Sequence, residues 1–157
     1  MQFLAWLETN GFSQWVLTTS WVYPWVIAFH SIGMGFLVGV VAMIALRTLG
    51  VGTFPIAPLE RYLTVVHVAL AVNVASGLTL FVIQAQEFFF SPTFRIKMLM
   101  IVAGIISGAL LNERLFGARA DASAGKAPQQ STKIIAGITL VCWAGAITAG
   151  RMTAYLP

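Results

Sequence analysis

Four stretches of the chain are apolar for long enough to cross a lipid bilayer, and this feature restricts the possible folds more than any other. A membrane-spanning α-helix needs about 20 consecutive apolar residues, and in lipid every backbone polar group must find its partner within the protein. The stretches cover approximately residues 24–46, 59–83, 94–111 and 134–154. The sequence therefore predicts four transmembrane helices.

The composition excludes an ordinary soluble domain. Of the 157 residues, 59% are hydrophobic and only 9% are charged, and the mean hydropathy is +0.87, whereas soluble domains carry about 25% charged residues. Four spans use most of the chain, so we predict one domain, residues 1–157, folded as an all-α four-helix bundle in the lipid bilayer. The lone cysteine, Cys142, lies inside the last stretch, which excludes a disulfide framework.

The N-terminal segment mixes apolar and polar side chains. Residues Gln2–Glu8 alternate aromatic and leucine side chains with polar ones, and the Asn10-Gly11 pair that follows is typical of a helix end. We therefore expect a short helix that lies in the membrane interface. It is followed by aromatic side chains of the kind that gather at the lipid–water boundary: Trp15, Trp21, Tyr23 and Trp25.

The basic residues predict the orientation of the bundle. The net charge is +4, but the charges lie at the ends of the apolar stretches, so nucleic acid is not an expected partner. One side carries most of the Lys and Arg residues: Arg47, Arg61, Arg114, Arg119, Lys126 and Lys133. The other side carries Arg95, Lys97 and Arg151. Under the positive-inside rule we expect both termini on the outer side of the membrane, which is the periplasm if the membrane is a bacterial inner membrane.

A histidine at membrane depth is the clearest sign of a functional site. His30 lies in the stretch WVIAFHSIGMGFLVG, with Met34 one helical turn further on, and ionisable residues within spans usually mark a site. At a rise of about 1.5 Å per helical residue, His30 lies about 9 Å below the outer end of its helix. Antiparallel spans bring further side chains to this outer layer: Lys97, Met98, Met100, Arg151 and Met152.

The register of Lys97 and Met152 with small residues indicates that both face a neighbouring helix. Lys97 shares a helical face with Gly104 and Gly108, and Met152 shares one with Ala149. Close helix packing in lipid depends on such small residues. Structural alternatives stay open, because cations can snorkel to the headgroups, methionines can fill a core, and the histidine can bond a carbonyl across a helix seam.

His67 belongs to a different level of the bundle. Counted from Leu59, it lies about 12 Å in from the cytoplasmic end of the second span. Its companions near the inner side are Met43 and Asn112. The depths of the two histidines differ by more than about 10 Å, which argues against one haem held by both. His67 is kept as a further cofactor-binding candidate.

Several stretches resemble a family of small four-helix bacterial integral membrane proteins that is functionally uncharacterised. They are SWVYPWVIAFHSIG, LRTLG, ASGLTLF and FFFSPTFRIKMLMI, within the region from Trp21 to Arg151. That family often carries an acidic residue at the place of Ala45. The group is also distantly similar to the membrane domains of copper-resistance D-type proteins and to four-helix b-type cytochromes. Either relation implies His30 as a ligand.

The main hypothesis from the sequence is a cofactor-binding bundle that takes part in electron transfer. His30 would be an axial or metal ligand, and haem b is favoured over copper because Lys97 and Arg151 suit the haem propionates. A copper site would combine His30 with soft thioethers such as Met34. The second haem ligand would be one of three methionines: Met98, Met100 or Met152.

The alternative is a non-catalytic accessory subunit that packs against a larger membrane complex or another copy of the chain. Its polar layer would then join its own helices, and its small-residue faces would serve docking. The sequence has no paired carboxylates within a span, no Ser/His/Asp set, no Gly-rich phosphate loop and no CxxC motif. Hydrolysis and phosphoryl transfer are therefore unsupported, and we favour a role other than that of an enzyme.

Overall fold

The protein is entirely helical across the elements of the computed structural model, which describes residues 2–117 and 128–153. Four of its helices are long and apolar enough to cross a membrane, which confirms the predicted all-α bundle of a multi-pass membrane protein. The elements are α1 (Gln2–Thr9), α2 (Gly11–Thr18), α3 (Val22–Thr48), the 3-10 helix η1 (Ala57–Tyr62), α4 (Leu63–Ile83), α5 (Ala85–Phe90), α6 (Pro92–Phe116) and α7 (Gln130–Met152).

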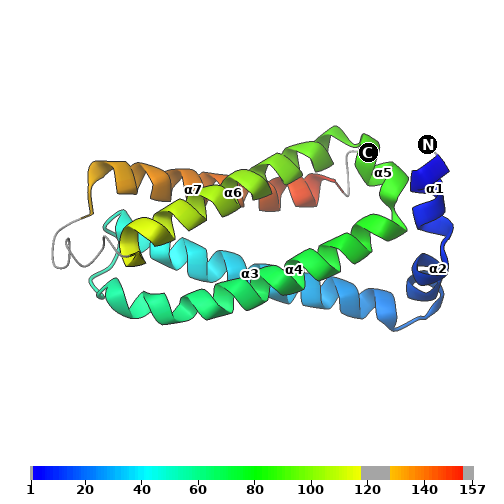
Figure 1. Ribbon diagram of the computed structural model, residues 1–157, viewed down its shortest axis with the longest axis horizontal. Coiled ribbons are helices and arrows are strands. Elements are labelled where there is room, and N and C mark those ends of the chain that lie inside the picture. Colours follow the sequence, from blue (N-terminus) through cyan, green and yellow to red (C-terminus); the bar gives the residue numbers. More distant parts are fainter. Residues whose placement is uncertain (1, 118–127, 154–157) are drawn as a thin grey trace.

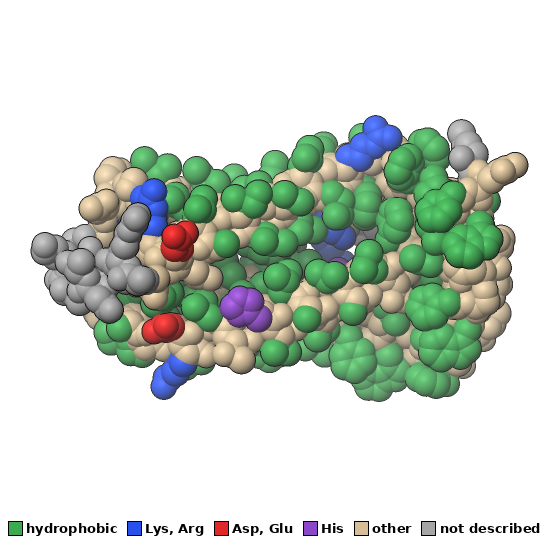
Figure 2. All heavy atoms as spheres, viewed as in Figure 1, with side chains coloured by type: hydrophobic (Ala, Val, Ile, Leu, Met, Phe, Trp, Pro, Cys, Tyr) green, Lys and Arg blue, Asp and Glu red, His purple; other side chains and the backbone are tan. Residues whose placement is uncertain are grey.

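The four long helices form two antiparallel pairs (Figure 1). α3 packs along α4, and α6 packs along α7 over an even longer contact. α3 also contacts α7 and so joins the two pairs, whereas the backbones of α4 and α6 come close at few points. At one end of the seam the rings of Phe81 on α4 and Phe94 on α6 stack with their centroids 5.7 Å apart. Figure 2 shows a hollow on this side, between α4 and α6. The bundle is therefore open along one seam.

The ends of the spanning helices follow from local chemistry. Ser91 caps α6, because its Oγ accepts a hydrogen bond of 3.3 Å from Phe94 N. Pro92 occupies the first position of α6, where a missing N–H breaks no helical hydrogen bond. The turn after α3 contains Gly50 and Gly52, whose φ angles of 101° and 83° favour glycine.

Three short helices, α1, α2 and α5, lie together at one end of the bundle (Figure 1). Asn10 follows α1 and caps α2, because its side chain accepts a hydrogen bond of 2.9 Å from Ser13 N. Glu8 of α1 accepts hydrogen bonds of 2.8 Å and 2.6 Å from the backbone N and the Nε2 of Gln86 in α5. The sequence pattern predicts α1 but not α2, because Asn10-Gly11 is typical of a helix end. In the structure the same pair also begins the next helix.

Exposed aromatic side chains surround this same end, as expected at a membrane interface. Figure 2 shows their rings over α1, α2 and α5. The side chains are Phe3, Trp6, Phe12, Trp15, Trp21, Trp25, Phe89 and Phe90, each about half exposed or more. We call this group the aromatic belt.

Small residues bring the helices together, while large apolar side chains face outward. Gly33 lies so close to α4 that an added Cβ would be 2.6 Å from Asn73 Nδ2. An added Cβ at Gly104 would lie 3.2 Å from the indole of Trp143 on α7. Leu99 and Val141, in contrast, are 70% and 68% exposed. Such outward faces suit a surface covered by lipid tails, where packing depends on close approach of the backbones.

Candidate functional sites inside the bundle

A hydrogen bond to Ser76 on α4 holds the His30 ring, and its direction follows from the second hydrogen bond that the serine makes. His30 Nδ1 lies 2.9 Å from Ser76 Oγ, and Ser76 Oγ donates its single proton to Val72 O at 2.6 Å. The serine oxygen therefore accepts a hydrogen bond from His30 Nδ1–H, and the lone pair of the neutral ring lies on Nε2. An imidazole oriented through one nitrogen in this way is prepared to act as a ligand through the other.

The backbone of α4 makes room for the imidazole. An added Cβ at Gly77 would lie 3.3 Å from His30 Cε1 and 3.8 Å from His30 Nδ1. One turn away, the buried Asn73 donates to Ala69 O at 2.9 Å. Its Oδ1 has no hydrogen-bond partner among residues 2–117 and 128–153. The His30 ring therefore lies beside a polar stretch of α4 that includes Asn73 and Ser76.

Lys97 approaches the same region from α6. An added Cβ at Gly150 of α7 would lie 3.4 Å from Lys97 Cε and 3.6 Å from Lys97 Nζ, and Nζ lies 5.9 Å from the centre of the Phe94 ring. The side chain thus packs against the neighbouring helix, in the direction that its register with Gly104 predicts. Lys97 is the sixth residue of α6 and His30 the ninth residue of α3, so both lie in the half of the bundle next to the aromatic belt. We call His30, Ser76 and Lys97 the His30 layer.

The methionines of the predicted outer layer divide between interior and surface. Met34 is partly buried against the central core cluster. Met100 packs against α7, because its Sδ lies 3.3 Å from the position of an added Cβ at Gly145. Met98 and Met152 are 43% and 41% exposed, and Arg151 is also exposed. Of the three methionines considered as a second haem ligand, Met100 is therefore the one that packs between helices.

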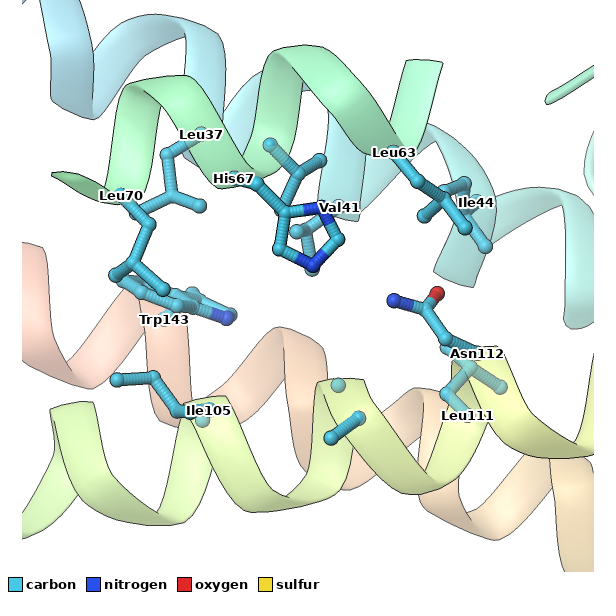
Figure 3. Close-up of a pocket in the computed structure, with 14 residues that line it drawn as sticks. Leu37, Val41, Ile44, Leu63, His67, Leu70, Ile105, Leu111, Asn112 and Trp143 are labelled. Carbon is cyan, nitrogen blue, oxygen red and sulfur yellow. The ribbon is translucent and has the colours of Figure 1, made fainter. Parts of the chain in front are cut away.

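A pocket of about 100 Å³ opens between the two helix pairs, where α4 and α6 are apart (Figure 3). Most of its lining is aliphatic, including Leu37, Val41, Ile44, Leu63, Val66 and Leu70. Three polar side chains point into it: His67 from α4, Asn112 from α6 and Trp143 from α7. We call this cavity the seam pocket.

Trp143 is the residue of the seam pocket that the sequence did not single out. It is only 4% exposed, and its Nε1 has no hydrogen-bond partner within the described part of the chain. A buried donor without a partner costs about 1–3 kcal/mol. The available signal was its position in the middle of a span, because tryptophan in membrane proteins usually lies at the interface and its N–H needs a partner when buried.

The two histidines belong to different sites. His30 is level with Ser76, and Ser76 lies nine residues along α4 from His67, a separation of about 13 Å in a helix. One haem clamped by both rings does not fit this arrangement. Within residues 2–117 and 128–153, no group of three or more His, Cys, Asp and Glu side chains is placed to hold a metal ion. A metal or haem at either histidine would therefore need other ligand types, such as thioethers.

Comparisons of the chain with known protein families, with curated proteins and with solved structures gave no match. Function is therefore inferred from the chemistry of the His30 layer and the seam pocket.

Proposed function

We propose that the protein binds a redox cofactor within the membrane and transfers electrons, with His30 as a ligand. The hydrogen bond between His30 Nδ1 and Ser76 Oγ carries this proposal. It orients the ring and leaves Nε2 as the atom that would donate to a metal. Histidine ligands are regularly supported by such a bond on the remote nitrogen. An ionisable side chain within a span costs free energy, and such a residue usually marks a functional site.

Haem b is preferred to copper because of the charges near His30. The propionates of a haem are anionic, and Lys97 and Arg151 supply cations at the same end of the bundle. The same cations would oppose a copper ion next to Met34. Met100 is the first choice for a second axial ligand, because it packs between α6 and α7. Haem, when bound, supplies one-electron chemistry, and this chain would hold and orient it.

We further propose that the membrane is a bacterial inner membrane and that both chain termini face the periplasm. Four basic residues lie at the end of the bundle opposite the aromatic belt: Arg47, Arg61, Arg114 and Lys133. Arg119 and Lys126, which contribute to the same charge bias, lie outside the described residues. The positive-inside rule supports this orientation.

The absorption spectrum of the purified protein tests the cofactor proposal. A Soret band is expected for the parent protein, and His30→Ala should lose the band while remaining inserted and helical. His67→Ala is the matched control and should keep it, because His67 lies at another level of α4. Equal cofactor content in His30→Ala and the parent, or a parent protein free of haem and copper, would refute the proposal.

A second candidate function is that of an accessory subunit in a larger assembly. It is favoured by a stripe of small residues on the outer face of α3, where Ser31, Gly35 and Gly39 are all exposed. An added Cβ at Gly35 or Gly39 would meet nothing within 4 Å. Small residues at this spacing allow close helix association in lipid, so the stripe offers a docking face for a further helix.

Substitution of the α3 stripe separates the two candidates. Gly35→Leu and Gly39→Leu should reduce self-association or co-purification of other membrane proteins if the stripe docks a helix. Gly137→Leu on α7 is the control, because an added Cβ there also meets nothing within 4 Å but lies off the stripe. A haem-containing protein whose assembly is unchanged by the stripe variants would favour the cofactor role alone.

A further inference from the structure

We propose that the seam pocket binds a neutral, lipid-soluble ring compound that presents a carbonyl oxygen. The proposal does not depend on a cofactor at His30. The seam pocket is lined by His67, which lies about 13 Å along α4 from the serine that holds His30. Three observations support it: an unpartnered buried donor, the convergence of polar groups on that donor, and an opening toward lipid.

The unpartnered donor is the indole N–H of Trp143. The residue is 4% exposed, its Nε1 finds no partner among residues 2–117 and 128–153, and Figure 3 shows the nitrogen directed into the seam pocket. Tryptophan can only donate, so its natural complement is an acceptor oxygen. Because the nitrogen is fully covered in this structure, a bound carbonyl reaches it through a small shift of the indole. The new hydrogen bond would then remove the cost of the unpaired N–H, and that gain is a source of affinity.

Two further polar groups face the same space. The Asn112 amide and the His67 ring both point into the seam pocket from opposite helices (Figure 3). Each can donate or accept a hydrogen bond, so they can serve a second polar atom on the ligand. Asp, Glu, Lys and Arg are missing from the described residues that line the pocket. A neutral ligand is therefore favoured over an ion, which would remain unpaired at membrane depth.

The size and opening of the seam pocket suit one edge of a ring whose remainder lies outside the pocket. The pocket volume is about 100 Å³, smaller than the roughly 150 Å³ of an apolar cavity that holds benzene, so the carbonyl edge of a ring can enter while the rest of the ring lies in the opening. The pocket lies where the backbones of α4 and α6 come close at few points, so part of a ligand can project between them into the acyl chains. Gly108 lines the pocket and has open space in front of its Cα. Mostly apolar lining with a few convergent polar groups is the usual character of a small-molecule site.

The indole signals of the full-length ¹⁵N-labelled protein in detergent micelles provide the test. The chain has five tryptophans, and the Trp143 signal is identified by its loss in Trp143→Phe. The probe is decylubiquinone, whose ring carries carbonyl oxygens, and the control probe is decylbenzene, which has a ring and the same tail without oxygen. Decylubiquinone should move the Trp143 N–H signal downfield until saturation, and decylbenzene should not.

The indole signals of the aromatic belt and two pocket variants serve as controls. Trp25 is 56% exposed in the belt, and its signal should change little and without saturation. Gly108→Leu fills the pocket and Asn112→Leu removes a polar partner; each should weaken probe binding about tenfold or more. Belt signals that move with the Trp143 signal would show partition into the micelle and overturn the proposal. A Trp143 N–H that exchanges with water, and whose signal does not shift when the probe is added, would also overturn the proposal.

Discussion

The Gly33→Ala substitution tests the closest approach between α3 and α4. An added Cβ would lie 2.6 Å from Asn73 Nδ2, 3.3 Å from Val72 Cγ1 and 3.4 Å from Ala69 O. The first distance is too short for any normal contact, and the Asn73 amide cannot move away without leaving Ala69 O, to which it donates at 2.9 Å. The alanine methyl group therefore has to separate the helices or displace a bonded side chain.

The free-energy cost follows from two terms. Overpacking a closely packed interior costs about 1–3 kcal/mol, and a hydrogen bond within a membrane bundle contributes about 0.6 kcal/mol on average. Alanine also favours the helix over glycine by about 1 kcal/mol. Gly35→Ala, on the same helix but with nothing within 4 Å of the added Cβ, carries only this favourable term. We expect Gly33→Ala to be less stable than Gly35→Ala by about 2–3 kcal/mol.

Equilibrium unfolding by sodium dodecyl sulfate in mixed micelles, followed by circular dichroism, measures this difference. Asn73→Ala provides an internal check, because it removes the atom that the new methyl group meets. Gly33→Ala should then cost less in the Asn73→Ala background than in the parent, with a coupling energy within the usual range of about 0.5–3 kcal/mol. Equal stability of Gly33→Ala and Gly35→Ala, with no coupling to Asn73, would show that α3 and α4 do not approach in this way.

Three further predictions follow from other contacts. Ser76→Ala should release His30 Nδ1, lowering the unfolding free energy by about 0.6 kcal/mol and changing the tautomer population seen in the ¹⁵N shifts of the ring; an unchanged ring spectrum would contradict the hydrogen bond. Glu8→Ala should free α1 from Gln86, and amide hydrogen exchange should rise in α1 and α5 while that of α6 stays the same. A reporter fused after Ala122, which lies outside the described residues, should give a cytoplasmic signal, and a periplasmic signal would reverse the proposed orientation.

The candidate sites could be predicted only in part. His30, His67 and Asn112 stand out in the sequence because polar side chains within apolar spans are rare and costly. The partner of His30 does not, since Ser76 is one of many small polar residues in the bundle and became significant only through its distance of 2.9 Å from Nδ1. Trp143 was missed for a similar reason, because its unpartnered nitrogen is visible only when its surroundings are known.

The sequence by itself determined that four helices are long and apolar enough to cross the bilayer. Apolar length decides this, because a chain in lipid must satisfy its backbone polar groups internally and only a sufficiently long helix can do so. The same property hides how the helices pack. A span is apolar toward lipid as well as toward its neighbours, so hydrophobic periodicity does not show which face of α3 or α4 is buried.

Only the tertiary structure decided which helices are neighbours. Close contact of α6 with α7 through Gly104 and Trp143, and of α3 with α4 through Gly33 and Asn73, leaves α4 and α6 apart. The seam pocket exists because of that separation, and no local pattern in α4 or α6 encodes it. The physical reason is that packing between helices in lipid depends on the fit of backbones and side chains across the whole bundle, which is a property of pairs of helices.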